Sequence, residues 1–544
     1  MLNTTVKIQE TEIRGFISSS GIANYLGIPY GEIPERFRPA RIVDPGTFHD
    51  GVIDAISYGA PCPQPVNGGR QRRSHLYEGS IPPSTTSAVD EFGCLSLNIY
   101  VPQDLDLLNN KLPVLVYIHG GGWVFGDGNS DYGSDADTPH SDGNILVREA
   151  TSLGKPFIFV CLNYRLGYFG FLSSRELQDE AARIGEDYQP NLGLYDQRLG
   201  LQWVQKYIQY FGGDSGSVTI AGQSAGAWSA LSHVVSNVEL GQRGLIMSSL
   251  VFSYQTVGEA QDNFDTLVRG TGLSISAPDD EKLAALRKLT YDQMAELLKG
   301  CILLRPVWDS KWFAYQDKPT RLEQITEFPN WIKEVAIGWT KDETSLMQPL
   351  WKSRNPEQVQ KIVKHSVPNN PQLAKEILEA YGMDNDSPEG VLEGLLDMTA
   401  ESFYAMFPPT MGEVRSPPIS LFRLEQIDPF EQSIYKGYAY HCLDTVLLCR
   451  FPAVAGPHAP ADLRESANAM TKTFACFVRG EQPLDPFHET GKVFIFNGSK
   501  TGSVNWPRNE RWRRFMSTDE RAKRFIDAGR FVLTHNVAAF YENS

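Results

Sequence analysis

A serine stands between small residues in the run Gly222-Gln223-Ser224-Ala225-Gly226. The residues before it, Ser217 to Ala221, are rich in β-branched side chains and predict a buried strand, and residues 226–233 are compatible with a helix. A strand that reverses directly into a helix leaves no room for side chains two positions either side of the reversal, so glycines are needed there. The pattern predicts a strained turn that exposes the hydroxyl of Ser224 as a nucleophile.

Three consecutive glycines form a second motif with chemical potential. Pro113 to Ile118 is a continuous apolar run, typical of a strand buried on both faces of a parallel sheet, and it leads into His119-Gly120-Gly121-Gly122-Trp123. Glycines at this point allow backbone N–H groups to approach a ligand oxygen without intervening side chains. Binding of an oxyanion requires such a loop, and the alternative interpretation is a flexible turn.

The segments around these motifs alternate between strand and helix patterns. Phe157 to Cys161 predicts another buried strand, and residues 191–211 carry apolar side chains at helical spacing until Gly212-Gly213 ends the pattern. Val335 to Trp339 is strand-like, and residues 5–18 alternate loosely and then turn at Gly21, which predicts a small antiparallel hairpin at the N-terminus. Alternation of this kind implies an α/β fold with a mostly parallel, doubly wound sheet.

The composition limits the classes of function. The 544 residues contain no linker, repeat or low-complexity tract, which favours a single domain over residues 1–544. A net charge of −15 argues against nucleic acid and anionic membranes as partners, and no segment is apolar enough to span a membrane. Residues 1–20 lack signal-peptide features, so we expect a cytoplasmic protein, or a secreted one if a leader has been removed. No metal-binding or dinucleotide-binding motif is present, and no cofactor is predicted.

Short motifs recur along the chain in a fixed order, and together they resemble the type-B carboxylesterase and lipase family, which includes the cholinesterases. The motifs that carry the resemblance are Gly27-Ile28-Pro29-Tyr30, Arg36-Phe37, Pro61-Cys62-Pro63-Gln64, Cys94-Leu95-Ser96-Leu97-Asn98 and Asn163-Tyr164-Arg165-Leu166-Gly167. The resemblance spans nearly the whole chain. It implies an α/β-hydrolase fold, with helical insertions at about residues 255–330 and 351–415 that form a cap over the pocket.

The resemblance also implies a catalytic triad in the chain order nucleophile, acid, histidine. Glu343 matches the family's acid, although Thr344 stands where the family usually has glycine, and Asp342 is the alternative acid. His441 matches the family's histidine, and Ser224 is the nucleophile. The implied oxyanion-hole donors are the amides of Gly121, Gly122 and Ala225. Four aromatic residues are expected to line the pocket: Trp123, Phe125, Trp228 and Tyr440.

The resemblance further implies a disulfide between Cys62 and Cys94. The chain has seven cysteines, and this odd number leaves at least one free thiol in a monomer. The loop between the two cysteines lacks both the apolar helical face of a lipase lid and a tryptophan that would bind quaternary ammonium, which disfavours the lipase and cholinesterase interpretations.

These residues predict a serine hydrolase that cleaves carboxylic esters through an acyl-enzyme. Three alternatives remain: an acyltransferase or a cyclase or lactonase acting on a specialised metabolite with the same triad, an amide hydrolase, and a non-catalytic binding module. The expected partner is a small-molecule ester, and the expected state is a monomer or homodimer.

Overall fold

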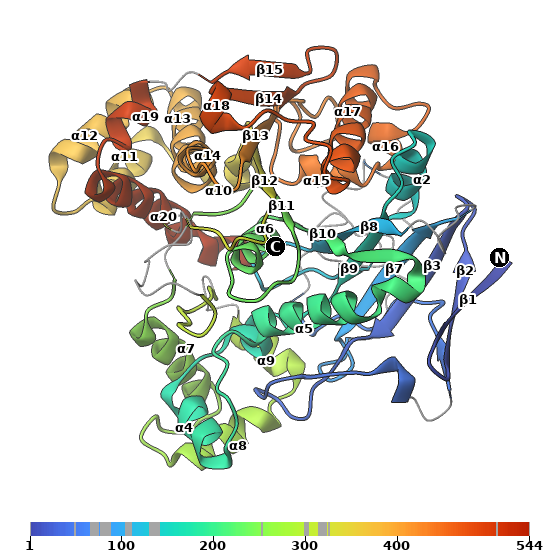
Figure 1. Cartoon of the computed structure of the whole chain (residues 1–544). Helices are drawn as coiled ribbons and strands as arrows, with labels where there is room; N and C mark the ends of the chain where they lie inside the picture. The colour runs from blue at the N-terminus through green and yellow to red at the C-terminus, as the bar shows by residue number, and fades with distance from the viewer. Residues whose placement is uncertain are drawn as a thin grey trace.

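A thirteen-stranded mixed sheet runs through the part of the chain that the structure describes (Figure 1). The structure is a computed structural model, and it describes residues 2–47, 51–65, 76, 89–103, 111–129, 142–251, 254–298, 304–313, 324, 327–506 and 510–542. The strands are β1 (Leu2–Ile8), β2 (Thr11–Ile17), β3 (Ile22–Pro29), β6 (Val52–Asp54), β7 (Ser96–Pro102), β8 (Leu112–Ile118), β9 (Ile158–Leu162), β10 (Gly213–Gln223), β11 (Arg243–Met247), β12 (Glu334–Thr340), β13 (Ile419–Leu424), β14 (Lys492–Phe496) and β15 (Gly502–Asn505). A separate pair is formed by β4 (Gly31–Glu32) and β5 (Arg41–Ile42).

The central strands are parallel and lie in the order β9, β8, β10, β11, β12, β13, β14. Antiparallel strands β1, β2, β3 and β7 extend one side of this array, and antiparallel β15 closes the other. Every residue of β9, β11 and β12 is buried, as expected of strands covered on both faces. The predicted mostly parallel sheet is therefore confirmed. An antiparallel hairpin is present at the N-terminus, but β1 and β2 turn at Gln9 and Glu10, inside the alternating segment, and the predicted turn at Gly21 joins β2 to β3.

Helices pack on both faces of the sheet. On one face α5 (Leu192–Tyr207) and α6 (Ala225–Val234) contribute to one apolar cluster, and on the other α2 (Asn144–Ser152), α15 (Leu443–Leu448) and α17 (Ala461–Val478) contribute to a second. The remaining helices that bear on the site are α4 (Arg175–Ile184), α7 (Val257–Gly270), α8 (Asp279–Lys288), α9 (Tyr291–Leu298), α11 (Pro356–Ser366), α12 (Pro371–Ala380), α13 (Pro388–Ala400), α14 (Phe407–Gly412), α19 (Glu510–Phe515) and α20 (Asp519–Glu542).

The two regions predicted to be insertions are helical. The first contains α7, α8 and α9, and α7 and α8 lie beside α4; the second contains α11 to α14 and groups with α19 and α20 (Figure 1). The second group has its own apolar cluster, to which α11, α12, α13 and α20 contribute. The buried side chains of α7, α8 and α9 instead belong to the cluster that α5 and α6 share with the sheet, so only the second group has packing of its own.

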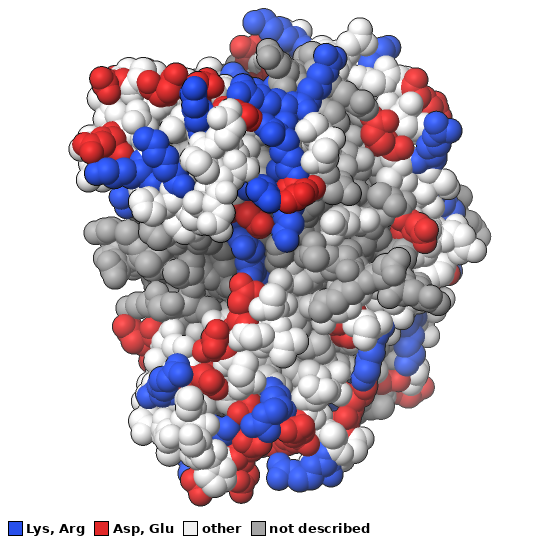
Figure 2. Space-filling model, turned by 90° about the vertical axis from the view of Figure 1, so that its left-hand side faces the viewer, with Lys and Arg blue, Asp and Glu red and all other residues white. Residues whose placement is uncertain are grey.

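Charges of both signs cover the face that carries these helices. Figure 2 shows Lys and Arg gathered in the middle of the upper half and acidic and basic side chains interspersed in the lower half. Ion pairs join α4 to α8, with 2.6 Å between Lys282 Nζ and Glu176 Oε1 and 2.6 Å between Arg287 and Glu180. The net negative charge of the chain therefore does not produce one acidic surface here.

The expected disulfide is absent, because Cys62 and Cys94 are both free, buried thiols. The Cys94 thiol donates to the carbonyl of Glu91 at 3.4 Å, and the Cys62 sulfur accepts the amide of Leu166 at 3.3 Å. The neighbouring Cys62 thiol and burial together raise the pKa of Cys94. Each sulfur thus has a partner as a thiol. Residues 66–75 and 77–88 of the loop between these cysteines, where no lid was predicted, lie outside the described residues.

The glycines on either side of Ser224 are required by close backbone contacts. A Cβ on Gly222 would lie 2.2 Å from the carbonyl oxygen of Gly226, and one on Gly226 would lie 2.1 Å from that of Ile118. We expect Gly226→Ala to lower the free energy of unfolding by about 3 kcal/mol or more, because backbone atoms must move to accept the methyl group. Urea denaturation measures the change. Gly502→Ala, where a Cβ meets open space, is the matched control, and equal stability of the two variants would contradict the strand–turn–helix packing.

Candidate active site

Ser224 occupies the turn between β10 and α6. Its backbone has φ 58° and ψ −126°, a conformation that a serine adopts only when its surroundings enforce it. The amide of Ser224 donates to the carbonyl of Met247 at 3.0 Å, and its carbonyl accepts the amide of Trp228 at 3.0 Å. The residue is 8% exposed, and within the described structure its hydroxyl makes no hydrogen bond. The strand, the strained turn and the helix are present where the sequence predicted them.

Glu343 and His441 are brought together from turns 98 residues apart. Nδ1 of His441 lies 2.5 Å from Oε2 of Glu343, and the amide of Thr340 donates to the other carboxylate oxygen at 2.7 Å. Glu343 has no exposed surface, and His441 is 7% exposed. An ionised carboxylate here accepts the Nδ1 proton, which leaves Nε2 as the unprotonated nitrogen of a neutral ring.

Asp342, the alternative acid, has a different position. Its Oδ2 accepts the amide of Ala439 at 2.8 Å, and its own amide donates to the carbonyl of Ala439 at 3.0 Å. Burial raises the pKa of Asp342, although the Ala439 amide opposes that shift. These bonds tie the acid turn to the turn that carries His441. The carboxylate in contact with the imidazole is that of Glu343.

Gln223 is a neighbour of His441 that the sequence did not reveal. Its Nε2 lies 3.2 Å from Nε2 of His441, and its Oε1 accepts the thiol of Cys442 at 3.4 Å. When the ring is neutral with its proton on Nδ1, Nε2 is the acceptor of this contact and the Gln223 amide is the donor. Catalytic hydrogen bonds are often completed only when substrate binds, so this contact fits a resting state. Gln223 stands in the variable position of the serine motif, where residue type alone gives no signal.

Tyr404 packs against the imidazole from η6 (Glu401–Ala405), a π-helical segment between α13 and α14. The ring centres of Tyr404 and His441 are 5.1 Å apart, at an interplanar angle of 52°. Burial of His441 disfavours its charged form, but Tyr404, Cys442 and Glu343 outweigh this effect and raise the pKa of His441 well above its ordinary value. π-Helical segments are frequent at functional sites.

The glycine loop lies directly beside the turn of Ser224. A Cβ on Gly120 would lie 2.7 Å from the carbonyl oxygen of Gln223 and 3.1 Å from Cβ of Ser224. Gly121 and Gly122 have φ values of 101° and 63°, which favour glycine. Across the described residues the amides of Gly121 and Gly122 donate to no protein acceptor. The amide of Ala225, the first residue of α6, likewise has no partner within its helix.

The aromatic residues expected in the pocket mostly belong to the core. Trp123 has no exposed surface, and its Nε1 donates to Ser229 Oγ at 3.1 Å. Trp228 is 1% exposed and meets Trp123 edge to face, with 5.5 Å between ring centres. Tyr440 is 1% exposed and stacks on Tyr435. These three side chains are therefore buried among other aromatic rings, and Phe125 is 8% exposed. That the four residues line the pocket stays a prediction.

In the described part of the chain, no group of three or more His, Cys, Asp or Glu side chains is placed to hold a metal ion. None of the helices with described residues is long and apolar enough to cross a membrane.

Comparisons with known proteins place this arrangement in a family. The model of the carboxylesterase family matches residues 3–534. A carboxylic ester hydrolase of Gibberella moniliformis is 34% identical over 277 residues, which cover 49% of this chain and 44% of that protein. The para-nitrobenzyl esterase of Bacillus subtilis is 34% identical over 229 residues, which cover 42% of this chain and 40% of the relative. The matched segments thus span less than half of these relatives.

The fold is that of a solved esterase. The structure of a PNB esterase superposes with a TM-score of 0.70 over 94% of this chain and 99% of the other, at 22% sequence identity. This likeness confirms the α/β-hydrolase fold predicted from the sequence. Since the family model covers almost every residue from the first strand to the last helix, the chain belongs to the carboxylesterase family.

Proposed function

We propose that the protein hydrolyses carboxylic esters of small molecules through an acyl-enzyme on Ser224. The observation that carries the proposal is the 2.5 Å contact between His441 Nδ1 and Glu343. It leaves Nε2 as the nitrogen that acts as the base, and in our proposal Nε2 exchanges its contact with the Gln223 amide for the hydroxyl of Ser224 when substrate binds. Family membership and the esterase names of the relatives support the same reaction.

The proposed reaction has two steps. His441 Nε2 takes the proton of the Ser224 hydroxyl as Oγ attacks the ester carbonyl carbon, and the imidazolium then protonates the leaving alkoxide. Water, deprotonated by the same nitrogen, attacks the acyl-enzyme and releases the acid. Glu343 stays ionised and stabilises the imidazolium. The amides of Gly121, Gly122 and Ala225 donate to the oxyanion in both steps, and loss of one such donor typically costs about 10²–10³ in kcat.

In our proposal the two helical regions cover the active site. Residues 255–330 and 351–415 act as a cap on a single domain, and Tyr404, from the second region, already contacts His441. A cap of this kind excludes water and selects the ester by shape. A monomer or homodimer and a cytoplasmic location remain predictions.

Burst kinetics with p-nitrophenyl acetate test the proposed function. We expect about one equivalent of p-nitrophenol per chain in a fast phase, followed by steady turnover in water without added alcohol. Turnover that requires an added alcohol or amine would instead identify an acyltransferase. No release of p-nitrophenol from several acyl lengths would favour a binding module and contradict the proposal.

The contact between Gln223 and His441 predicts a pH effect. The base must be neutral, so kcat/KM falls as the pH drops below the pKa of His441. Gln223→Glu places a carboxylate within about 4 Å of Nε2, which favours the imidazolium and raises that pKa further. We expect the acid limb of the kcat/KM profile to move up by about one pH unit or more. Gln223→Met is the uncharged control and should leave the limb within a few tenths of a pH unit; an unmoved limb in Gln223→Glu would show that this side chain does not face the base.

A further inference from the structure

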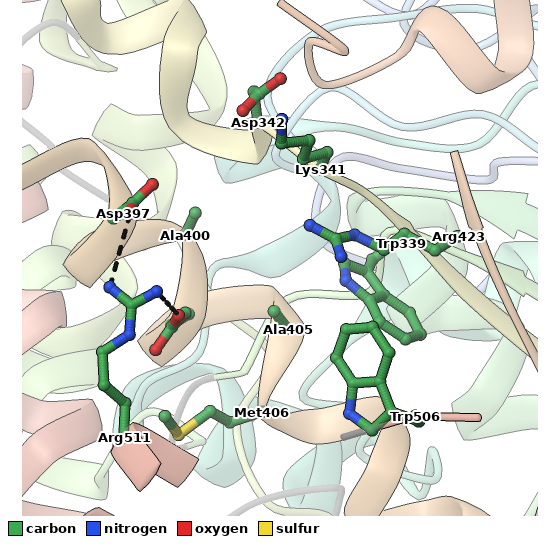
Figure 3. A pocket seen from close by; sticks show the side chains of 11 residues that line it. Trp339, Lys341, Asp342, Asp397, Ala400, Ala405, Met406, Arg423, Trp506 and Arg511 are labelled. Atoms are coloured by element: carbon green, nitrogen blue, oxygen red, sulfur yellow. Dashed lines mark hydrogen bonds and ion pairs between the residues drawn. The ribbon is translucent and has the colours of Figure 1, made fainter. Parts of the chain in front are cut away.

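A pocket with a volume of about 290 Å³ lies at the carboxyl edge of the sheet (Figure 3). Its lining comes from the ends of β12 and β13, from α13 and η6, and from residues at and beyond the end of β15. None of Ser224, Glu343 and His441 lines it. A volume near 300 Å³ is at the lower end of the range for small-molecule sites, which suits a ligand with one or two rings.

The two arginines of this pocket differ in how far the protein's own carboxylates use their hydrogen-bond donors. Arg511 pairs with Asp397 at 3.5 Å and Glu401 at 3.0 Å, so its charge is balanced by the protein. Arg423 points its guanidinium into the pocket (Figure 3) and pairs through one nitrogen with Glu425 at 3.1 Å. Among the described residues its Nε is buried and has no hydrogen-bond partner. Most of the five N–H donors of the Arg423 guanidinium are therefore not used by the part of the chain that the structure describes.

Lys341 adds a second available cation at the rim. It is exposed, and no ion pair joins its ammonium group to a described carboxylate. Asp342 also lines the pocket, but one of its carboxylate oxygens already accepts the amide of Ala439. The hydrogen-bonding capacity that remains is mainly that of donors, which suits an anion.

The wall next to Arg423 is aromatic. Trp339 and Trp506 meet edge to face with 5.2 Å between ring centres, and the guanidinium carbon of Arg423 lies 5.3 Å from the ring centre of Trp506. Met406 adds an apolar, adaptable side chain to the lining. A guanidinium held against an aromatic surface binds a planar carboxylate in two-point fashion, while the surface packs against an attached apolar ring.

We propose that this pocket is a binding site for a small aromatic carboxylate, separate from the ester site. The two sites share a wall: Tyr404 of η6 contacts His441 on one side, and the next residues, Ala405 and Met406, line the pocket on the other. The carboxylate of the ligand pairs with Arg423 and Lys341, and its ring lies against Trp506 and Met406.

Calorimetric binding to the full-length Ser224→Ala protein tests the proposal with three probes that share one ring system. Indole-3-acetate carries the carboxylate, tryptamine carries an ammonium group, and indole is neutral. We expect indole-3-acetate to bind at least about tenfold more tightly than either of the others, because only it forms the charge-assisted bonds. Arg423→Met is expected to weaken its binding about tenfold or more.

Further variants make the result decisive. Lys341→Met changes an exposed side chain and leaves the packing intact, and we expect it to weaken indole-3-acetate binding several-fold even if Arg423→Met does not fold. Arg148→Met, an exposed arginine on α2, is the matched control and should bind as the parent protein does. No binding of indole-3-acetate at millimolar concentration, equal binding of tryptamine, or unchanged binding in both pocket variants would overturn the assignment.

Discussion

Replacing Ser224 with alanine is expected to lower kcat for p-nitrophenyl acetate by about 10⁶-fold, to the level set by the oxyanion donors and substrate binding alone. The side chain makes no hydrogen bond within the described structure, so its loss removes the nucleophile without breaking a structural contact. His441→Ala should cost a similar factor, because nucleophile and base act as a unit, and the double variant should be little worse than either single one.

The control for this prediction is stability. Alanine has the same Cβ as serine, so Ser224→Ala leaves the backbone strain at φ 58° unchanged. Urea denaturation should therefore show a change in the free energy of unfolding of no more than about 1 kcal/mol. His365→Ala, which changes an exposed histidine on α11, should keep full activity. A Ser224→Ala protein that is folded and still hydrolyses the ester at a tenth of the parental rate or faster would show that another residue is the nucleophile.

The second large effect is expected at the acid. Glu343→Gln preserves shape but replaces the carboxylate that accepts His441 Nδ1, so it disturbs the tautomer and removes the charge that stabilises the imidazolium. We expect kcat to fall by about 10⁴-fold, as when the acid of a triad becomes its amide. The pH profile gives a second readout. Without the carboxylate the pKa of His441 falls, and the acid limb of the residual activity should move to lower pH.

Asp342→Asn separates the two acids. An asparagine oxygen can still accept the amide of Ala439, so the acid turn should stay joined to the histidine turn and most of the activity should remain. Comparison of kcat for the two amide variants is the measurement. A larger loss in Asp342→Asn than in Glu343→Gln would contradict the pairing of Glu343 with the imidazole.

Much of the fold was predictable because burial leaves a strong pattern in the sequence. The apolar runs that became β8, β9 and β12 were recognisable since both faces of each strand are covered by helices. The glycines around Ser224 were recognisable because the backbone of Gly226 itself fills the space that a Cβ would need at Gly222. A feature can be predicted from the sequence where the local backbone conformation and the tertiary packing require the same type of residue.

Other features depend on contacts between distant segments. The approach of Gln223 to His441 spans 218 residues, and no motif marks a glutamine as the partner of an imidazole. Trp123 and Trp228 were expected at the pocket because they follow the motifs, but whether a large ring points into a cavity or into the core is decided by packing. The free thiols of Cys62 and Cys94 show the same limit, since each found a partner as a thiol.

The aromatic carboxylate pocket is the extreme case. Trp339 and Arg423 are opposite each other in the register of β12 and β13, whereas Trp506 and Arg511 come from much later in the chain. Two tryptophans and two arginines at these spacings are unremarkable in a linear sequence. Only the three-dimensional arrangement shows that Arg511 is paired with two carboxylates, whereas Arg423 is paired with one, Glu425, and keeps donors to spare among the described residues.

The central claim is that Ser224 is the residue that becomes acylated. Treating the protein with a fluorophosphonate until ester hydrolysis stops, followed by peptide mass spectrometry, tests this claim most directly. We predict one phosphonyl group per chain, located on Ser224, and no modification of the His441→Ala protein at the same exposure. Loss of activity with the adduct on another side chain, or full activity with Ser224 modified, would contradict it.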